Sequence, residues 1–192
     1  MHKIIAIVGM CGAGKSIVSD YFVNNHSFEY VRFGQITLDE VKRLGLAPTE
    51  ENERPIRESF RKEHGMAAFA ILNIPKFDEA LIKGNLIADG LYSWAEYKVL
   101  KEYYKERLIV LAVIASPKIR YERLDKRILE KSDTNLRNRR FTPEQAKARD
   151  YAEIENSDKG GPIAMADHYL LNEENIEELN KQLERLYQKI IS

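Results

Sequence analysis

Three glycines near the N-terminus precede a lysine and a serine. The segment Gly9-Met10-Cys11-Gly12-Ala13-Gly14-Lys15-Ser16 matches the pattern G-x-x-x-x-G-K-[ST], between a buried apolar run and a helical pattern. Glycines in such a loop let backbone N–H groups surround a phosphate, the lysine reaches the β- and γ-phosphates, and the serine hydroxyl can ligate Mg²⁺. The alternative is a glycine-rich turn without a ligand. We predict a nucleotide site formed by Gly9, Gly12, Ala13, Gly14, Lys15, Ser16 and Ile17.

Asp89 is the strongest candidate for a second metal ligand. It ends the apolar run Asn85–Asp89 and is followed by Gly90, and open parallel sheets bind ligands at the carboxyl ends of their strands. Such a carboxylate can hold Mg²⁺ and can also accept the proton of a substrate hydroxyl. The alternative is an aspartate that only forms a turn with Gly90. We predict a metal site at Ser16 and Asp89, and catalytic roles for Lys15 and Asp89.

Positive charge is concentrated between residues 118 and 149. This segment holds eleven basic and five acidic residues, and its net +6 is balanced by −6 elsewhere. Arg120, Arg123 and Arg127 share one face of a predicted helix, and Arg149 follows an irregular stretch, so the cluster could clamp a transferring phosphoryl group and close over it. Nucleic-acid binding and a solvated helix face are the alternatives. We predict catalytic roles for Arg123, Arg127 and Arg149.

A second basic row lies in the segment between the second and third predicted strands. Arg54, Arg57 and Arg61 could seat a substrate phosphate. Five glutamates surround them, so surface ion pairs are an equally good interpretation.

Five short runs predict the strands that would position these residues. They are Ile4–Val8, Phe28–Phe33, Asn85–Asp89, Leu108–Ala115 and His168–Leu171. Helical patterns alternate with them, so we predict an α/β fold with a parallel sheet covered on both faces. The length of 192 residues suits a single domain over 1–192.

Capping signals and apolar spacing predict the helices. A helix over 15–25 follows the glycine loop, and a capping box, Thr37 to Glu40, opens one that Gly45 stops. Thr49 can cap a helix that extends towards His64, although Pro55 is awkward unless it lies in the first turn. Ser93 opens a helix that extends to about Arg107. Ser116-Pro117 opens a helix that holds Tyr121, Leu124 and Ile128, and Thr142-Pro143 opens another. Ile176, Leu179, Leu183, Leu186 and Ile190 stripe a terminal helix, for which sheet packing is favoured over a coiled coil.

The composition excludes several classes of protein. Hydrophobic residues make up 44% and charged residues 31%, unlike a disordered chain. The longest apolar run has eight residues, far short of the roughly 20 that span a bilayer. Zero net charge gives no overall attraction to nucleic acid or anionic membrane. A single cysteine, Cys11, and the lack of a signal-peptide pattern favour the cytoplasm.

Motifs along nearly the whole chain resemble the adenylate kinase and dephospho-CoA kinase branch of P-loop kinases. They are Gly9 to Ser16, Arg32-Phe33-Gly34, Asp89-Gly90, Arg120-Tyr121-Glu122-Arg123-Leu124 with Arg127, Arg149-Asp150, and Ala166-Asp167-His168-Tyr169-Leu170-Leu171-Asn172. The chain is most similar to adenylate-kinase-related, dephospho-CoA-kinase-like proteins of archaea and bacteria. The resemblance implies a five-stranded parallel sheet of order 2-3-1-4-5, an ATP site with Mg²⁺, a substrate-binding lobe near 35–84 and a lid near 128–142. Together with the basic row described above, we predict a substrate site at Phe33, Gly34, Arg54, Arg57, Arg61 and Tyr92.

Two positions depart from these relatives. Gln35 replaces an acidic residue that relatives often carry, and Tyr92 replaces an arginine with which many nucleoside monophosphate kinases hold the acceptor phosphate. Tyr92 weakens the nucleoside monophosphate as acceptor.

Two classes of function follow from these features. The first is a Mg²⁺-dependent ATP phosphotransferase acting on a small nucleotide-like acceptor, either dephospho-CoA or a nucleoside monophosphate. The second is a catalytically weak nucleotide-binding regulator of the same fold, which the two departures motivate. A GTPase lacks support because the Asn-Lys-x-Asp motif is missing, and nucleic acid is an unlikely partner. The residues do not determine the oligomeric state.

Overall fold

A five-stranded parallel sheet forms the centre of the molecule in the computed structural model, which describes residues 1–128 and 140–191. The strands are β1 (Ile4–Val8), β2 (Glu29–Arg32), β3 (Leu86–Asp89), β4 (Leu108–Ile114) and β5 (His168–Leu171). Their order is β2-β3-β1-β4-β5, and all four pairings are parallel. The predicted α/β class, the five strands and the 2-3-1-4-5 order are confirmed.

Strand register brings the predicted site residues to one edge of the sheet. Asp89 is level with Ile7 of β1 on one side and with Arg32 of β2 on the other. The glycine loop begins after Val8, so it starts beside Asp89 and the Arg32-Phe33-Gly34 turn. The glycine loop, Asp89 and the Arg32-Phe33-Gly34 turn therefore lie together at the carboxyl ends of neighbouring parallel strands, where open sheets bind ligands.

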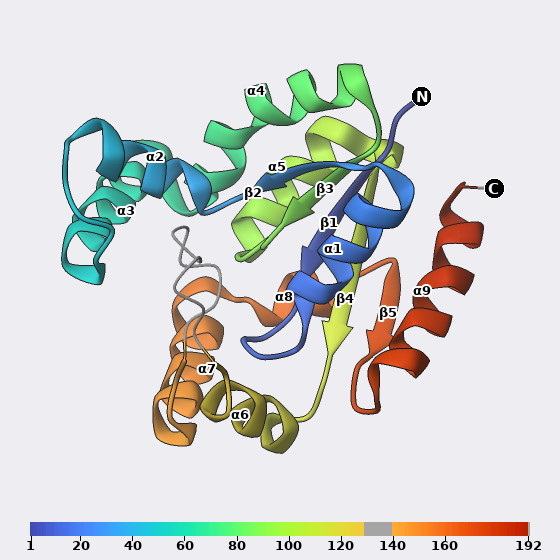
Figure 1. The fold of residues 1–192 in the computed structure, drawn as a ribbon. Coiled ribbons are helices and arrows are strands. Elements are labelled where there is room, and N and C mark those ends of the chain that lie inside the picture. The colour runs from blue at the N-terminus through green and yellow to red at the C-terminus, as the bar shows by residue number, and fades with distance from the viewer. Residues whose placement is uncertain (129–139, 192) are drawn as a thin grey trace.

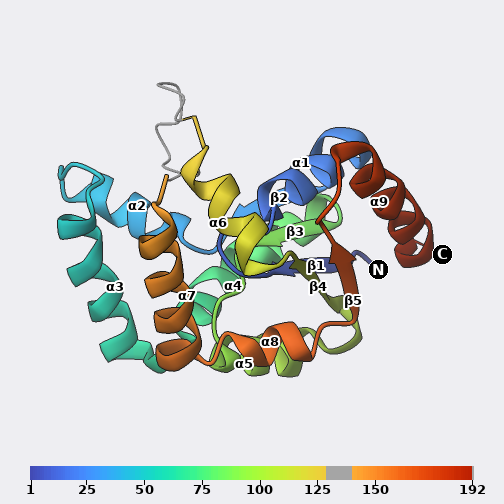
Figure 2. The ribbon, with the colours of Figure 1, turned by 90° about the horizontal axis from the view of Figure 1, so that it is seen from below.

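Helices cover both faces of the sheet (Figures 1 and 2). α1 (Lys15–His26) and α9 (Ile176–Ile191) lie on one face. α4 (Ala68–Lys83), α5 (Trp94–Tyr104) and α8 (Gly160–Ala164) lie on the other. Two helix pairs project beyond the carboxyl edge, α2 (Gln35–Arg43) with α3 (Glu50–His64) and α6 (Pro117–Asp125) with α7 (Pro143–Ser157).

Apolar side chains of β1 contribute to both layers of the core. Ile5 and Ile7 pack with Phe22 of α1 and Leu183 of α9, whereas the Ile4 side chain packs in the opposite layer. This alternation buries both faces of the strand, as parallel sheets require. In the terminal stripe, Leu179, Leu183, Leu186 and Ile190 are buried, while Ile176 is half exposed.

Three predicted caps match the structure. Ser93 and Glu96 form a capping box at the start of α5, and Thr142 and Gln145 form another at the start of α7. Thr49 accepts a hydrogen bond from the Asn52 backbone N–H at the start of α3. These three helix starts were predicted correctly because the side chain that accepts from the free backbone N–H groups lies next to them in the sequence.

The capping box predicted at Thr37 is wrong. α2 begins at Gln35, directly after the Gly34 turn, so Thr37 lies inside the helix and is buried. The Phe33 N–H donates to the Asp89 carbonyl, 3.0 Å away, and ties the helix start to the sheet. This tertiary contact outweighs the local capping signal.

Other helical segments were not anticipated or end differently. The sequence patterns did not identify α4 or α8, and Pro55 lies in the second turn of α3. α6 ends at Asp125, which leaves Ile128 outside the helix and exposed. Most of the predicted lid, 129–139, lies outside the described residues, as do Lys131, Arg137 and Arg139 of the basic cluster. In the described part of the chain, every helix is too short or too polar to span a membrane.

Candidate active site

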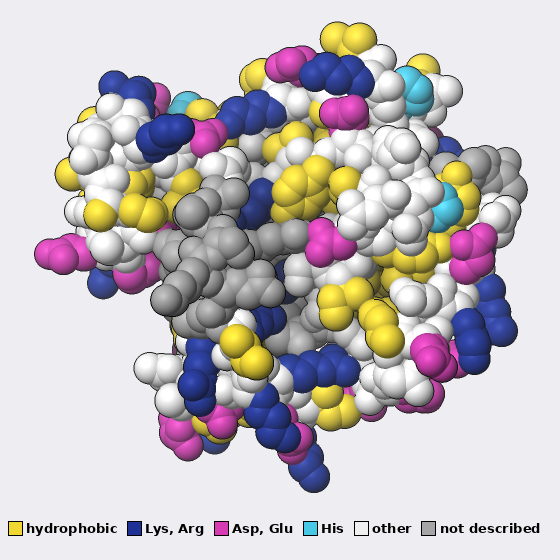
Figure 3. Space-filling model, in the orientation of Figure 1, with side chains coloured by type: hydrophobic (Ala, Val, Ile, Leu, Met, Phe, Trp, Pro, Cys, Tyr) yellow, Lys and Arg dark blue, Asp and Glu magenta, His cyan; other side chains and the backbone are white. Residues whose placement is uncertain are grey.

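A cleft of about 530 Å³ opens at the carboxyl edge of the sheet, and α2, α3 and α7 contribute to its walls. It is lined by Cys11, Gly12, Gly14, Lys15, Ser16, Arg32, Phe33, Gly34, Thr37, Leu38, Glu50, Glu53, Arg57, Arg61, Phe69, Asp89, Gly90, Tyr92, Glu96, Arg127, Phe141, Arg149, Ala152, Glu153 and Lys159. Seven of these side chains are cationic and five are acidic. Lys and Arg side chains are also visible over α6 and α7 (Figure 3).

The glycine loop forms the floor of the cleft and leads into α1. Gly14 has φ +100°, and a Cβ there would lie 2.2 Å from the Asn172 amide nitrogen. Asn172, which follows β5, donates from that nitrogen to the Ala13 carbonyl at 2.8 Å. Asn172, the last residue of the motif Ala166 to Asn172, therefore holds the glycine loop in place through a contact distant in sequence.

Lys15 is half-buried and lines the base of the cleft. Its ammonium donates to the Gly9 carbonyl at 2.8 Å and to the Met10 carbonyl at 3.1 Å. Burial, together with the nearby charge of Lys159, lowers the pKa of Lys15 to about 8. A bound anion would offset both effects, so the lysine is suited to holding a phosphate.

Ser16 and Asp89 both line the cleft and offer hard oxygen ligands. The Asp89 carboxylate accepts a hydrogen bond from the Tyr30 hydroxyl at 2.8 Å. Among the described residues, no cluster of three or more His, Cys, Asp or Glu side chains could hold a metal ion. A hydroxyl and one carboxylate fit Mg²⁺ that is bound partly through substrate phosphates, which is the usual arrangement for this ion.

The basic row on α3 has two sides. Arg57 lines the cleft and pairs with Glu53, 3.1 Å away, and with Glu50. Arg61 also lines the cleft, with its guanidinium 5.6 Å from the centre of the Phe69 ring. Arg54 lies outside the cleft, where it is exposed and pairs with Glu58 at 2.8 Å. Two of the three predicted substrate arginines therefore reach the site.

Two buried polar atoms at this end of the cleft have no hydrogen-bond partner within the described ranges. They are Nε of Arg61 and the hydroxyl oxygen of Thr37. Buried polar groups are nearly always paired, so such atoms call for an explanation, and a ligand is one.

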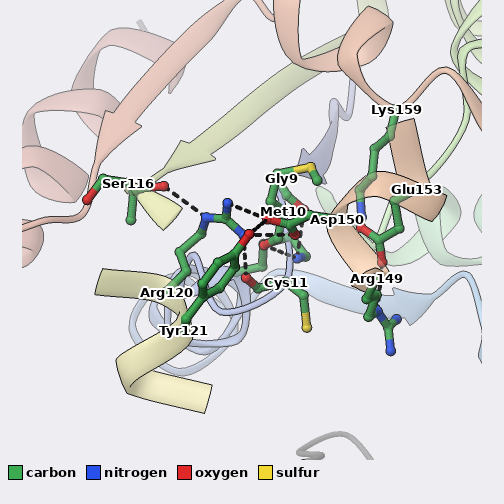
Figure 4. Close-up of polar contacts among 12 residues, drawn as sticks. Gly9, Met10, Cys11, Ser116, Arg120, Tyr121, Arg149, Asp150, Glu153 and Lys159 are labelled. Atoms are coloured by element: carbon green, nitrogen blue, oxygen red, sulfur yellow. Dashed lines mark hydrogen bonds and ion pairs between the residues drawn. The ribbon is translucent and has the colours of Figure 1, made fainter. Parts of the chain in front are cut away.

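The arginines predicted to share one helix face have different roles, and Arg127 lies beyond the end of α6. Arg127 lines the cleft together with Arg149 of α7. Arg123 does not line it, because its guanidinium donates to the Asn172 carbonyl at 2.8 Å. Arg120 is buried and forms a two-pronged ion pair with Asp150, at 2.9 and 2.6 Å. Arg120 thus serves the packing of the loop and the helices, and Figure 4 shows it between them.

Several lining residues were not identified from the sequence. Glu153 and Lys159 form a buried ion pair of 2.6 Å, and Arg149 donates to the same carboxylate at 2.8 Å (Figure 4). Burial would raise the pKa of Glu153, but the charges of Lys159 and Arg149 outweigh it and keep that pKa below its usual value. No motif marks these positions, and only the fold brings them to the cleft.

Glu96 and Tyr92 lie side by side in the cleft wall. The Glu96 carboxylate accepts the backbone N–H groups of Tyr92 and Ser93, at 2.9 and 3.0 Å. Burial outweighs these bonds and raises the pKa of Glu96 to about 7. Burial, with the Glu153 charge, raises the pKa of Tyr92 to about 12. The capping box predicted the position of Glu96 but not its burial.

The remaining predicted residues fall into three groups. Gly12, Gly14, Phe33 and Gly34 line the cleft. Gly9, Ala13 and Ile17 do not line it, but Gly9 and Ala13 carry the carbonyls that bind Lys15 and Asn172. Gln35 lies outside the cleft and donates to Asp39 at 3.0 Å.

Comparison with known proteins gives this arrangement a family context. A family model described as an AAA domain matches residues 5–150. A UPF0200 protein of Thermococcus gammatolerans is 34% identical over 98% of this chain and 95% of its own length. One of Methanocaldococcus jannaschii is 31% identical over 98% of this chain and 91% of its own length.

Solved structures show the same fold. Shikimate kinase of Bacteroides thetaiotaomicron has a TM-score of 0.59 at 13% identity, covering 99% of each chain. A gluconokinase of Sinorhizobium meliloti has a TM-score of 0.53 at 12% identity, covering 97% of each chain. These TM-scores support a shared P-loop kinase-like fold, and at 12–13% identity the comparison concerns the fold alone. Because the family model matches residues 5–150 of the 192 and the relatives match nearly the whole chain, this protein belongs to the AAA domain family and to the UPF0200 proteins.

Proposed function

We propose that this protein is a Mg²⁺-dependent phosphotransferase that moves the γ-phosphoryl group of ATP to a small nucleotide-like acceptor. The observation that carries the proposal is one continuous cleft with the glycine loop at one end and the unpaired Arg61 and Thr37 atoms at the other. A phosphotransferase needs a donor site and an acceptor site that face each other across the reacting atoms. Asp89 lies at the strand edge between the two ends.

The donor end is formed by the glycine loop. Backbone N–H groups of the loop and the α1 N-terminus favour an anion, and Lys15 adds a positive charge. Ser16 and Asp89 would hold the Mg²⁺ ion, which supplies charge stabilisation at the transferring phosphoryl group when bound. Arg127 and Arg149 line the cleft and add further positive charge. Catalysis by Arg123 requires its guanidinium to leave the Asn172 carbonyl.

The acceptor end lies under α2 and α3. Arg57 and Arg61 offer charged donors to an acceptor phosphate, while Phe33, Gly34 and Tyr92 shape the wall. Dephospho-CoA and nucleoside monophosphates are the two acceptors that we propose, as the resemblance to the adenylate kinase and dephospho-CoA kinase branch implies. A phosphate acceptor needs no base, whereas a ribose hydroxyl would transfer its proton to Asp89 as its oxygen attacks phosphorus and ADP leaves.

Phosphoryl transfer from labelled ATP to a panel of acceptors tests the proposal. Wild-type protein should label one acceptor, and Lys15→Ala should not. Asp89→Asn distinguishes the chemistry through its pH dependence, because loss of a base removes a pH-dependent step only for a hydroxyl acceptor. If no acceptor is labelled above the Lys15→Ala background, the transferase proposal fails.

The two sides of α3 provide a matched pair of variants for the acceptor end. Arg61→Ala should raise the KM for the acceptor by about 10- to 100-fold, because it removes charged hydrogen bonds worth roughly 1.5–3 kcal/mol. Arg54→Ala removes the same side chain from the outer side of the helix and should leave that KM unchanged. Equal effects of the two variants would contradict the assignment of the acceptor end.

The alternative, a catalytically weak nucleotide-binding regulator, is supported by Tyr92, which lines the cleft where relatives carry an arginine. Tight binding of ATP without transfer to any acceptor, together with a stable partner protein, would favour it. Gln35, the other departure, lies outside the cleft and gives it no support.

A further inference from the structure

Lys159 places a buried positive charge in the cleft from a segment outside the recognised motifs. It follows Asp158, which ends α7 with φ +49°, and directly precedes α8. The Lys159 side chain extends towards Glu153 and Arg149 (Figure 4). It is 5% exposed, yet the residue lines the cleft. Lysine is rarely this buried unless it has a partner or a role.

The contacts of Lys159 hold its ammonium in place without using all of its donors. Its Nζ donates to Glu153 at 2.6 Å and lies 4.5 Å from the centre of the Tyr92 ring. An ammonium has three N–H donors. Within the described ranges, Glu153 is the one acceptor in hydrogen-bond contact with it, so two donors are available to a ligand.

The charges around Lys159 call for an anion. Its ammonium and that of Lys15 repel each other inside the cleft. Glu153 lies against both Lys159 and Arg149, so one carboxylate is shared between two cations. Buried like charges are costly unless an anion compensates them. A phosphate group, with several oxygens and more than one negative charge, matches these donors in both number and charge.

We propose that Lys159 contacts the γ-phosphoryl group of the bound nucleotide and that Glu153 is the residue that positions it. The proposal rests on the nucleotide site of the proposed function. The γ position follows from the neighbours of Lys159, because it interacts with Lys15 on the donor side and with Tyr92 on the acceptor side. Tyr92 brings no charge to this part of the cleft, whereas Lys159 does.

Calorimetry with two nucleotides tests the inference without any acceptor. We compare Mg²⁺ complexes of ADP and of β,γ-methylene ATP, which cannot transfer its terminal group. Lys159→Met should weaken binding of the ATP analogue by about 10- to 100-fold, the loss expected for a hydrogen bond to a charged group, and binding of ADP by less than about 3-fold. Lys147→Met is the matched control, because Lys147 is exposed on α7 and lies 5.8 Å from the Tyr151 ring. It should change neither affinity.

Loss of Lys159 leaves the Glu153 charge buried beside Arg149 alone, so a folding defect must be separated from a binding defect. The double variant Lys159→Met with Glu153→Gln removes both charges and should show the same selective loss of the ATP analogue. Equal losses for both nucleotides, or none, in the double variant would overturn the inference and leave the transferase proposal to the phosphoryl-transfer assay. Wild-type protein that binds neither nucleotide would overturn both. Selective loss in a protein that labels no acceptor would support the inference and reject transferase activity.

Discussion

At the scale of single residues, the cleft contains acidic groups whose burial conflicts with their charge. Glu96 is 1% exposed, and within the described part of the chain its carboxylate accepts hydrogen bonds from two backbone N–H groups and from no other donor. Burial raises its pKa from 4.5 to about 7. The folded protein therefore binds a proton at Glu96 at pH values where the unfolded chain has released it.

This difference makes stability depend on pH. Because the pKa of Glu96 is raised in the folded state, its favourable contribution is complete below pH 4.5 and is lost as the pH rises through about 7. The loss should amount to about 3 kcal/mol of unfolding free energy between pH 4.5 and pH 8. Urea unfolding of wild-type protein and Glu96→Gln measures it. Glutamine retains an acceptor for the N–H groups and does not titrate, so this part of the pH dependence should disappear.

A wild-type and a Glu96→Gln protein with parallel stability profiles between pH 4.5 and pH 8 would contradict the raised pKa. The comparison between the two proteins matters because other groups also titrate in this range. Burial makes the pKa of Glu96 sensitive in this way, since the residue makes no ion pair among the described residues.

At the scale of elements, one buried ion pair connects the glycine loop to two helices. Arg120 of α6 donates to the Asp150 carboxylate of α7 and to the Cys11 carbonyl of the loop, the latter at 3.0 Å. The Tyr121 hydroxyl donates to the same carboxylate at 2.8 Å. Asp150 is adjacent to Arg149, so the pair also determines where that arginine enters the cleft.

Asp150→Asn should destabilise the fold strongly. Asparagine retains the shape of the side chain but leaves the Arg120 charge buried without its counter-ion, which typically costs about 3–5 kcal/mol. Asp125→Asn is a matched control, because Asp125 pairs with Arg140 at 3.3 Å on the surface and such pairs contribute about 1 kcal/mol or less. Chemical unfolding of the two variants gives the comparison. The double variant Arg120→Met with Asp150→Leu should be more stable than Asp150→Asn, because it leaves no unpaired charge buried. Similar losses of unfolding free energy for Asp150→Asn and Asp125→Asn would refute this account.

The elements show which patterns can be predicted from a sequence. Four strands were predicted from short apolar runs and β2 from an alternating, aromatic-rich stretch, whereas α5 and α7 were predicted because their caps are local. α2 was predicted to start too late because Phe33, two residues before the helix, is tied to Asp89, more than fifty residues away. α4 was missed because its start has no side-chain cap and it contains Pro75. Local rules describe local hydrogen bonds, and they fail where a tertiary contact determines the element.

At the scale of the whole molecule, the donor end of the cleft was largely predictable and the remainder was not. A phosphate-binding loop needs particular residues at consecutive positions, so Lys15 and Ser16 are visible in the sequence. Glu153 and Lys159 come from the end of α7 and the turn after it, and only the packing of α7 and α8 brings them to the cleft. Arg120 and Arg123 have the spacing of a clamp, yet Arg120 is buried against Asp150 and Arg123 binds Asn172. The spacing of residues along a sequence predicts which side chains share a helix face, but it does not predict what that face contacts in the fold.

The charge distribution of the molecule favours a small anion as its ligand. The chain is neutral overall, while the described lining of the cleft has seven cations and five acids. Mg²⁺-ATP at 100 times its Kd should therefore stabilise the folded protein by about 2.7 kcal/mol, which raises the Tm of a domain of this size by roughly 5–11 °C. Thermal unfolding measures the shift, and Lys15→Ala should lose most of it because its ammonium no longer meets the phosphates. A shift of equal size in Lys15→Ala, or with Mg²⁺ alone, would show that the stabilising ligand binds elsewhere than at the glycine loop.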